Sequence, residues 1–274
     1  MWSDGYELID AGDGRRLERF GSRVVDRPAP SVAIEPPGTG RDAWAAAELR
    51  FDRAEGWTGP NQEPWTIVVE DLTLELRLTG AGQLGIFPEH VLAWPWLRDR
   101  LVARPGPEVL HLFAYTGATT LTLAAAGARV THVDASRPAV AWARRNAELS
   151  GLADRPVRWI VDDAIAFARR EARRGRRYQG FVLDPPTYGH GPAGTRWELE
   201  DALPDLLVAC AAVADPDAFV LLTAHATTIE PHDLAAALEI AFGIPAELET
   251  GEVELEATSG VVMPLGVAAR MIRR

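Results

Sequence analysis

The feature that most constrains the fold is an apolar strand that turns directly into a helix within residues 109–126. Residues 109–113 read as the strand, and a short turn ending at Gly117 leads into the helical segment 118–126. A second predicted strand, 129–134, follows and ends on an aspartate. This arrangement suits a nucleoside, because the turn lets a ligand approach the backbone and the carboxylate can accept both ribose hydroxyls.

A dinucleotide fits this turn less well than a ligand without phosphates. Dinucleotide sites use three glycines in the pattern G-x-G-x-x-G, so that the pyrophosphate can lie on the helix N-terminus. This turn contains only Gly117. The plain alternative is a strand–helix turn that binds nothing. Against it, Asp134, Asp163 and Asp184 each end or follow a predicted strand.

Strands and helices alternate regularly through the second part of the chain. The predicted strands are 109–113, 129–134, 157–161, 180–184 and 218–224, and the predicted helices are 118–126, 137–150, 164–174, 199–214 and 231–242. Such alternation implies a mostly parallel sheet that is covered on both faces. Two closing strands, near 246–257 and 266–272, have no full helix between them and suggest an antiparallel hairpin. We therefore expect an α/β fold with a Rossmann-like, seven-stranded, mostly parallel sheet.

Residues 1–103 have a different character and predict a small β-rich module. The pattern indicates strands at 6–10 and 15–20 around an Asp-Gly hairpin turn, a Pro- and Gly-rich loop at 27–40, paired strands at 65–70 and 72–78, and a linking helix at 91–101. We expect two domains, 1–103 and 104–274. Six of the nine tryptophans lie in the first, where they could form a base-stacking platform or fix the core of a small domain.

The overall charge counts against a nucleic-acid partner, whereas its local distribution leaves room for one. The formal net charge is −11, and proteins that bind nucleic acid usually present a basic face. Six arginines nevertheless lie within residues 169–177. They can be a solvated helix face paired with nearby acids, or a ridge that contacts RNA.

Cysteine usage and hydropathy predict a cytoplasmic protein. Cys210 is the only cysteine, so neither an intrachain disulfide nor a multi-cysteine metal site can form. No apolar run is long enough to cross a bilayer, and the first residues show no signal-peptide pattern. The six histidines lack ligand spacing, so we expect no metal and no membrane association.

A second acidic strand end, within residues 181–188, carries the candidate catalytic residues. The segment reads Phe-Val-Leu-Asp-Pro-Pro-Thr-Tyr, and its two prolines fix φ and remove backbone donors. A planar amine could donate to Asp184 and to the carbonyl of Pro185. Tyr188 could stack on a flat base or pack against the end of the sheet. The alternative is a strand end whose prolines only stop the sheet.

Taken together, these segments resemble the bacterial 23S rRNA large-subunit methyltransferase family, whose members are class I S-adenosylmethionine-dependent enzymes. The resemblance covers most of the chain and is carried by residues 6–14, 17–20, 85–90, 112–117, 131–136, 141–144, 158–164 and 184–188. It implies a class I methyltransferase domain preceded by a small β-rich module. It also implies S-adenosyl-L-methionine as cofactor and RNA, in particular rRNA, as substrate.

In a sheet of this kind ligands bind at the carboxyl ends of the strands, so we expect the cofactor there. The residues expected beneath its methionine part are Phe113, Tyr115, Thr116 and Gly117. Asp134, with its neighbour Ala135, is expected at the ribose diol, although this segment also resembles a helix N-cap.

The adenine is expected at the end of the third strand of the sheet. There, Asp163 would accept from the adenine amino group and the Ala164 amide would donate to the ring; a plain N-cap aspartate is the alternative. Asp184 is expected to contribute to the cofactor site as well as to the chemistry.

Two departures from the family pattern argue against cytosine C5 as the acceptor atom. Members that make 5-methylcytosine usually carry an N-terminal RNA-binding domain of the PUA type, for which there is no room before Tyr6. They also have a cysteine near the end of the fifth strand, where residues 219–226 have none. Cytosine C5 needs a thiolate to add at C6 first. Cys210 reads instead as a buried structural thiol within a helix.

The function expected from the sequence is methylation of an rRNA base at a nitrogen. The alternatives are a methyltransferase of a protein or small molecule, and a non-catalytic protein that retains the fold. The nucleotide, the acceptor atom and the oligomeric state stay open.

Overall fold

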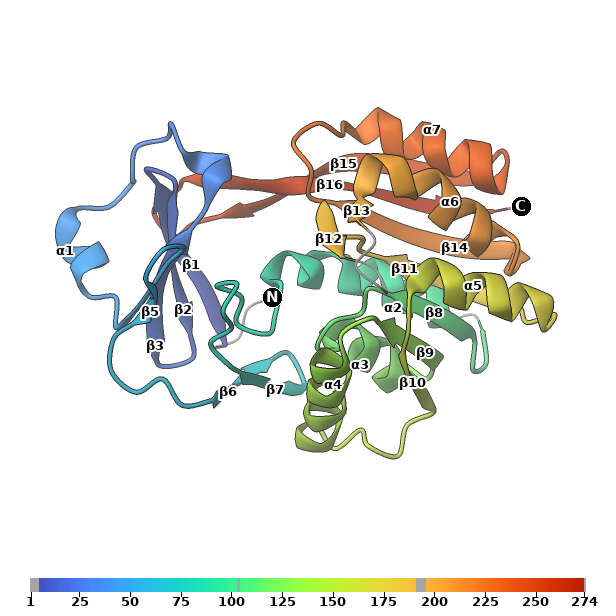
Figure 1. Ribbon diagram of the computed structural model, residues 1–274, viewed down its shortest axis with the longest axis horizontal. Helices are drawn as coiled ribbons and strands as arrows, with labels where there is room; N and C mark the ends of the chain where they lie inside the picture. Colours follow the sequence, from blue (N-terminus) through green and yellow to red (C-terminus); the bar gives the residue numbers. More distant parts are fainter. Residues whose placement is uncertain (1–4, 103, 191–195, 274) are drawn as a thin grey trace. The chain divides into compact units, whose positions relative to one another are not determined.

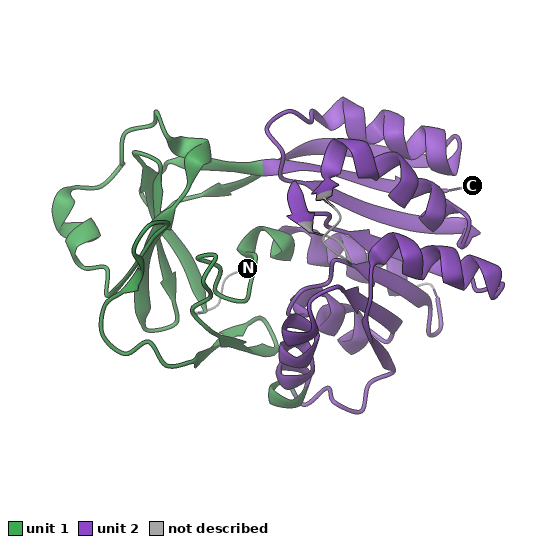
Figure 2. Cartoon of the chain, viewed as in Figure 1, with its two compact units in different colours: residues 1–91, 148–150, 254–265 green, residues 92–147, 151–253, 266–274 purple. Residues whose placement is uncertain are grey.

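The computed structural model describes residues 5–102, 104–190 and 196–273. The chain forms two compact units (Figure 2): the first comprises Met1–Val91, Glu148–Ser150 and Glu254–Leu265, and the second comprises Leu92–Ala147, Gly151–Val253 and Gly266–Arg274. The division into domains between residues 103 and 104 stays a prediction.

The second unit contains a seven-stranded sheet in the order β10-β9-β8-β11-β14-β16-β15 (Figure 1). Its strands are β8 (Glu108–Leu112), β9 (Arg129–Asp134), β10 (Val157–Val161), β11 (Tyr178–Leu183), β14 (Ala214–Ala224), β15 (Glu247–Glu256) and β16 (Val262–Ile272). The five strands from β10 to β14 pair in parallel, and β16 pairs with β14 antiparallel. The predicted class I methyltransferase fold is therefore confirmed.

Helices cover both faces of this sheet, as the alternation of the sequence predicted. On one face lie α5 (Ala164–Arg173), α6 (Leu199–Ala211) and α7 (Pro231–Phe242), with α6 packed against both neighbours. On the other lie α2 (Trp94–Val102), α3 (Ala118–Ala125) and α4 (Arg137–Leu149). A sheet buried on both faces explains why its central strands read as nearly continuous apolar runs. None of the helices that the structure describes is long and apolar enough to cross a membrane.

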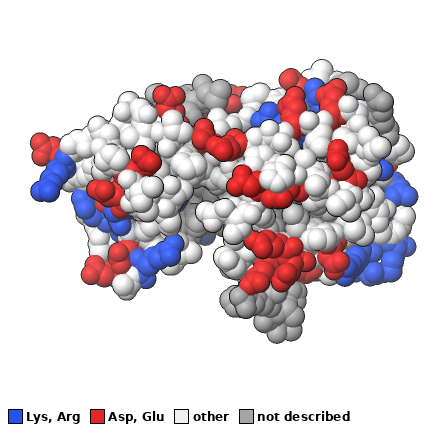
Figure 3. All heavy atoms as spheres, turned by 90° about the horizontal axis from the view of Figure 1, so that it is seen from above, with Lys and Arg blue, Asp and Glu red and all other residues white. Residues whose placement is uncertain are grey.

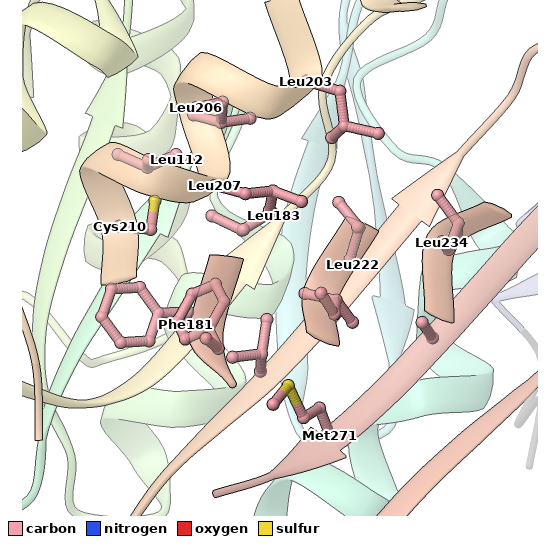
Figure 4. Close-up of a cluster of buried hydrophobic side chains, with 14 of the residues drawn as sticks. Leu112, Phe181, Leu183, Leu203, Leu206, Leu207, Cys210, Leu222, Leu234 and Met271 are labelled. Carbon is pink, nitrogen blue, oxygen red and sulfur yellow. The ribbon is translucent and has the colours of Figure 1, made fainter. Parts of the chain in front are cut away.

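The core of the second unit lies between the sheet and α6 (Figure 4). Leucines 203, 206 and 207 of α6 interdigitate with side chains of the strands, among them Phe181, Leu183 and Leu222. Cys210 lies on the same face of α6 and is fully buried in this cluster. The prediction of a buried structural thiol is confirmed.

The first unit is built on a five-stranded sheet. Its strands, in the order β1-β2-β3-β4-β5, are Tyr6–Gly12, Arg15–Phe20, Arg23–Pro28, Leu49–Asp52 and Gly56–Thr58. A separate hairpin joins β6 (Trp65–Val69) to β7 (Leu72–Leu76), and short helical segments are η1 (Pro30–Val32), α1 (Arg41–Ala45) and η2 (Pro88–Ala93). Asp13 and Gly14 adopt positive φ values of 51° and 74°, as the predicted hairpin turn requires.

Strand β3 begins before the predicted Pro-rich loop and extends into it. The sequence pattern did not reveal this strand, because charged residues are among its buried side chains. Arg27 is buried and donates to the two carboxylate oxygens of Glu18 on β2, over 2.5 and 3.0 Å. Asp26 likewise accepts from Arg15 at 2.6 Å. Charged residues that pair across strands in a buried sheet do not show the alternation by which strands are predicted.

Asp10 organises the loop that follows β3. Its carboxylate accepts hydrogen bonds from Gly38, from the amide and hydroxyl of Thr39, from Trp44 Nε1 and from Ser259 Oγ. Burial alone would raise the pKa of Asp10, but the bonds from Ser259, Thr39 and Trp44 lower it to about 2. Ser259 lies in the turn between β15 and β16, so this carboxylate attaches that turn to the first unit.

Tryptophans of the first unit are held as structural residues. The indole of Trp57 donates to the carbonyl of Thr79 at 2.7 Å, and that of Trp65 donates to the carbonyl of Phe20 at 3.2 Å. Arg23 covers the Trp65 ring at 4.2 Å from its centroid. These contacts favour the role of fixing a small core over that of a base-stacking platform.

Candidate active site

The acidic residues singled out in the sequence follow neighbouring strands of one sheet. Asp134 ends β9, Asp163 follows β10 and Asp184 follows β11, while Phe113 follows β8 between them. These strands are parallel, so their carboxyl ends meet at the same edge. In open α/β sheets ligands bind outside this edge, at the point where the strand order reverses. Here the order reverses at β8.

The turn from β8 to α3 is strained. Phe113 and Tyr115 both adopt left-handed backbone conformations, with φ values of 57° and 48°. Each such residue costs about 1–3 kcal/mol and persists only where the surroundings hold it, and such strain gathers at ligand sites. Here Tyr115 N donates to Asp134 Oδ2 at 2.8 Å, and the carbonyl of the buried Thr116 accepts from Asn146 Nδ2 at 2.9 Å. Both contacts fix the turn against the next strand and helix.

Gly117 is required for packing. It caps the N-terminus of α3 with φ +84°, and a Cβ atom there would lie 2.9 Å from the Cβ of Ala143 on α4. Real Cβ atoms essentially never approach so closely. The structure shows that this glycine lets α3 and α4 approach each other. Its place in a cofactor site stays a prediction.

Asp134 carries two backbone contacts and a perturbed acidity. Its Oδ1 accepts from Ser136 N and its Oδ2 from Tyr115 N, both at 2.8 Å. Burial raises the pKa of Asp134, and these two amide bonds offset that rise only in part. The N-cap expected in this segment is supplied by Ser136, whose Oγ accepts from Ala139 N at the start of α4. Ala135 is exposed beside it.

Asp163 is a helix cap in this structure. It is the N-cap of α5, and its Oδ1 accepts from Ala166 N at 2.8 Å. Its neighbour Asp162 is ion-paired with Arg170. Ala164 is buried in the first turn of α5, where backbone N–H groups have no partner within the helix. The structure thus confirms the N-cap alternative for Asp163. The adenine site expected at Asp163 and Ala164 stays a prediction.

Asp184 is held by a neighbouring strand that the sequence analysis did not connect with it. Its Oδ1 lies 2.5 Å from Thr223 Oγ1 and 2.9 Å from His225 Nε2, at the end of β14. Pro185 is buried, and within the described part of the chain no hydrogen bond engages its carbonyl oxygen. Thr223 and His225 were missed, although the predicted strand 218–224 ends at the same edge and could have drawn attention to them.

A small hairpin follows the two prolines and was not predicted. It joins β12 (Tyr188–His190) to β13 (Arg196–Glu198). Trp197 donates from Nε1 to the Pro186 carbonyl at 2.7 Å, and its ring lies 5.2 Å from that of Phe113. The Tyr188 side chain is 72% exposed, so it does not pack against the end of the sheet. Strands of three residues have too few positions to show a periodic pattern.

The arginine cluster, residues 169–177, is largely paired within the chain. Arg169 pairs with Asp205, Arg170 with Asp162 and Arg174 with Glu171, and Arg177 donates to the carbonyl of Ala212. The side chains of arginines 173 and 176 have no ion-pair partner among the residues that the structure describes. On the face drawn in Figure 3, basic side chains gather near one end and lie among acidic ones at the other, and acidic side chains gather between them.

The donors and acceptors at this edge fit S-adenosylmethionine. A carboxylate oxygen has lone pairs for more than one donor, so Asp134 can accept from a ribose diol in addition to its two amides. The turn at this edge is held in left-handed backbone conformations at Phe113 and Tyr115. The turn from β8 to α3 carries no phosphate-binding glycine pattern, in agreement with a cofactor that carries no phosphate.

Comparison with known proteins identifies the family. Residues 25–222 match the model of a family described as S-adenosylmethionine-dependent methyltransferase. The crystal structure of a SAM-dependent methyltransferase from Agrobacterium tumefaciens covers 100% of this chain and 92% of its own, with 33% identity and a TM-score of 0.92.

Curated relatives match a shorter segment. Ribosomal RNA large subunit methyltransferase K/L of Shewanella sp. (strain ANA-3) is 34% identical over 120 residues, and that of Shewanella frigidimarina is 32% identical over 117. Each match covers 42% of this chain and only 16% of the relative. The family model spans most of the chain, and a full-length structural counterpart agrees with it: the chain belongs to the S-adenosylmethionine-dependent methyltransferase family.

Proposed function

We propose that the protein methylates an exocyclic amino nitrogen of a base in RNA, with large-subunit rRNA as the favoured substrate. The observation that carries this proposal is the Asp184 carboxylate at the end of β11, followed by two prolines and adjoining the strained turn after β8. S-adenosylmethionine supplies a methyl group on a cationic sulfur. The protein has to bind it, bring an acceptor nitrogen into line and receive a proton.

The cofactor-binding residues in this proposal are those predicted from the sequence. The turn from Phe113 to Gly117 lies along the methionine part, Asp134 accepts from the ribose diol, and Asp163 with Ala164 meets the adenine. Asp134 supports its role best, because both its oxygens are already oriented by amide donors at the strand edge. Asp163 can use Oδ2 for the adenine amine while Oδ1 caps α5.

We assign an amine as the group that receives the methyl, because this edge of the sheet offers oxygen atoms that can accept its hydrogen bonds. An exocyclic amine has two N–H groups, which match the Asp184 carboxylate and the Pro185 carbonyl. A ring nitrogen such as guanine N7 has no hydrogen to donate to either. As the nitrogen bonds to the methyl carbon and the carbon–sulfur bond breaks, one N–H proton must leave, and the carboxylate of Asp184 can take it. Orientation of this kind can contribute about 7–11 kcal/mol to lowering the barrier.

Cytosine C5 does not fit this site. That chemistry needs a thiolate that adds to the ring, and Cys210 is the only cysteine of the chain. It is fully buried in the hydrophobic core, and burial raises the pKa of its thiol well above the ordinary value. The curated relatives, which are named as rRNA methyltransferases, support an RNA substrate. The exposed side chain of Tyr188, four residues after Asp184 in the sequence, offers such a substrate a stacking surface.

A protein or small-molecule acceptor is the second candidate. The net charge of −11 and the internal pairing of most of the arginine cluster favour it. The two candidates separate when purified protein and methyl-labelled cofactor are added to a lysate of a strain that lacks the gene. We expect the label in large-subunit rRNA; label in protein or in small molecules, with none in RNA, would reject the proposal.

A further inference from the structure

Two side chains of β14 and its C-terminal end hold the carboxylate of Asp184 at one oxygen. Thr223 Oγ1 lies 2.5 Å from Asp184 Oδ1 and 3.3 Å from the carbonyl of Leu183. The hydroxyl has one hydrogen, and the shorter distance to the charged oxygen assigns it to the carboxylate. His225 Nε2 lies 2.9 Å from the same Oδ1. We propose that Thr223 and His225 are positioning residues that fix Asp184 for the methyl acceptor, an inference that rests on the proposed function.

The fold brings these three residues together. In the parallel pairing of β11 with β14, Leu183 lies opposite Leu222, so Asp184 comes beside Thr223. His225 is two positions further along, and side chains two apart on an extended chain point to the same side. Both partners therefore reach Asp184 from one direction.

The backbone that carries His225 is itself fixed by close packing. Gly266 on β16 has φ +141°, and a Cβ atom there would lie 2.2 Å from the carbonyl oxygen of Ala224 and 3.1 Å from the Cα of His225. Only glycine allows this approach. The backbone of β16 thus packs in close contact with the segment that carries His225.

Two contacts on Oδ1 determine where the other oxygen points. An aspartate side chain has two rotatable bonds, and anchoring one oxygen with two partners restricts both. The direction of Oδ2 is then fixed before an acceptor arrives. A carboxylate that must meet one N–H of an amine needs such a fixed direction, since a misplacement of about 1 Å can lower a rate about 100-fold.

The test compares isosteric and donor-retaining variants. Thr223→Val removes the hydroxyl with little change of volume, and His225→Leu removes the imidazole donor. In His225→Gln the side-chain amide can replace the Nε2–H donor. The matched control is His232→Gln on α7, where the side chain is 82% exposed. Each purified variant is assayed for kcat with rRNA and for the dissociation constant of S-adenosylhomocysteine.

We expect Thr223→Val and His225→Leu each to lower kcat at least about tenfold. The dissociation constant of S-adenosylhomocysteine should change less than about twofold in both variants. His225→Gln should recover most of the rate, and His232→Gln should match the wild type. Crystal structures of Thr223→Val and His225→Leu should show Asp184 in a changed rotamer or in two.

Several results would overturn the inference. Unchanged kcat in Thr223→Val and His225→Leu would do so, and so would an equal loss in His225→Gln and His225→Leu when both are folded. A fall in S-adenosylhomocysteine affinity as large as the fall in kcat would assign these residues to the cofactor site instead. If His225→Leu does not fold, Thr223→Val alone decides. A wild type that methylates no RNA rejects the proposed function, while the Asp184 rotamer in the crystal structures still reports on the positioning.

Discussion

At the scale of single residues, Asp134 links the structure most directly to cofactor binding. In the proposed binding mode, Asp134→Ala removes two charge-assisted hydrogen bonds to the ribose, each worth about 1.5–3 kcal/mol, so affinity should fall at least about tenfold. Calorimetric titration with S-adenosylhomocysteine measures this. Unchanged affinity in the folded variant would remove Asp134 from the site.

The raised pKa of Asp134 predicts a pH dependence of binding. In the proposed binding mode the ribose diol donates to the ionised carboxylate, so binding favours the deprotonated form. Because burial raises the pKa in the free protein, affinity should decline as pH falls through that raised value, by up to about tenfold per pH unit. Asp134→Asn should bind more weakly and without this pH step. A step of the same size in wild type and Asp134→Asn would assign it to another group.

Cys210→Ser should remain active, because no thiolate adduct takes part in the proposed chemistry. A hydroxyl in the apolar core costs stability, so the variant should melt at a lower temperature while its kcat per folded molecule is kept. A variant that is folded but inactive would instead restore the covalent mechanism at cytosine C5.

Which site residues the sequence could reveal depended on local pattern. Asp134, Asp163 and Asp184 stood out because each lies where an apolar strand ends. Thr223 and His225 also lie at a strand end, but their role depends on the pairing of β11 with β14, which no local pattern specifies.

At the scale of elements, the packing of α3 against α4 depends on Gly117. Gly117→Ala combines a positive φ with a Cβ contact of 2.9 Å, whereas Gly127 has φ +96° and nothing within 4 Å of a Cβ. Both variants carry the backbone cost of about 1–2 kcal/mol, so the additional destabilisation in Gly117→Ala reports the packing. Urea denaturation should show Gly117→Ala as clearly less stable than Gly127→Ala; equal destabilisation would contradict the packing role.

Two buried histidines join α3 to the sheet and predict an acid-sensitive fold. Thr120 Oγ1 lies 2.7 Å from His111 Nδ1 and 2.9 Å from His132 Nδ1. Burial, and then the neighbouring His111, lower the pKa of His132 well below its ordinary value. The unfolded chain then binds more protons below about pH 6.5, so stability should fall by up to about 1.4 kcal/mol per pH unit there.

Urea denaturation between about pH 7.5 and 5.5, on either side of the ordinary histidine pKa, measures this effect. His132→Leu should lose most of the dependence, and His232→Gln, whose side chain is exposed, should keep it. A wild type whose stability is flat over this range would show that His132 is protonated without cost.

The order of elements in the second unit could be predicted because its strands are apolar runs separated by amphipathic helices. Among the elements that escaped prediction, two show why a local pattern was missing. Strand β3 relies on the buried pair of Arg27 with Glu18, and the β12–β13 hairpin has strands of only three residues.

At the scale of the whole molecule, the question is whether the arginine cluster provides the positive charge with which this acidic protein binds RNA. The structure ends α5 at Arg173, and Gly175 follows with φ 66°, so Arg176 does not continue the face shared by Arg169 and Arg173. If the cluster neutralises phosphates, replacing these three arginines with glutamine should make the slope of log K against log salt shallower. The change should be about one unit for each phosphate that is no longer neutralised. RNA binding that keeps its slope in the triple variant would assign RNA recognition to another surface.

The most direct test of the proposed function is the identity of the methylated nucleoside. Large-subunit rRNA from a strain that lacks the gene is incubated with methyl-labelled cofactor and either wild-type protein or Asp184→Ala, then digested to nucleosides and analysed by mass spectrometry. We predict label on the exocyclic amine of a base with the wild type and almost none with Asp184→Ala, although that variant still binds S-adenosylhomocysteine. Label on cytosine C5 or guanine N7, or equal labelling by the two proteins, would contradict this function.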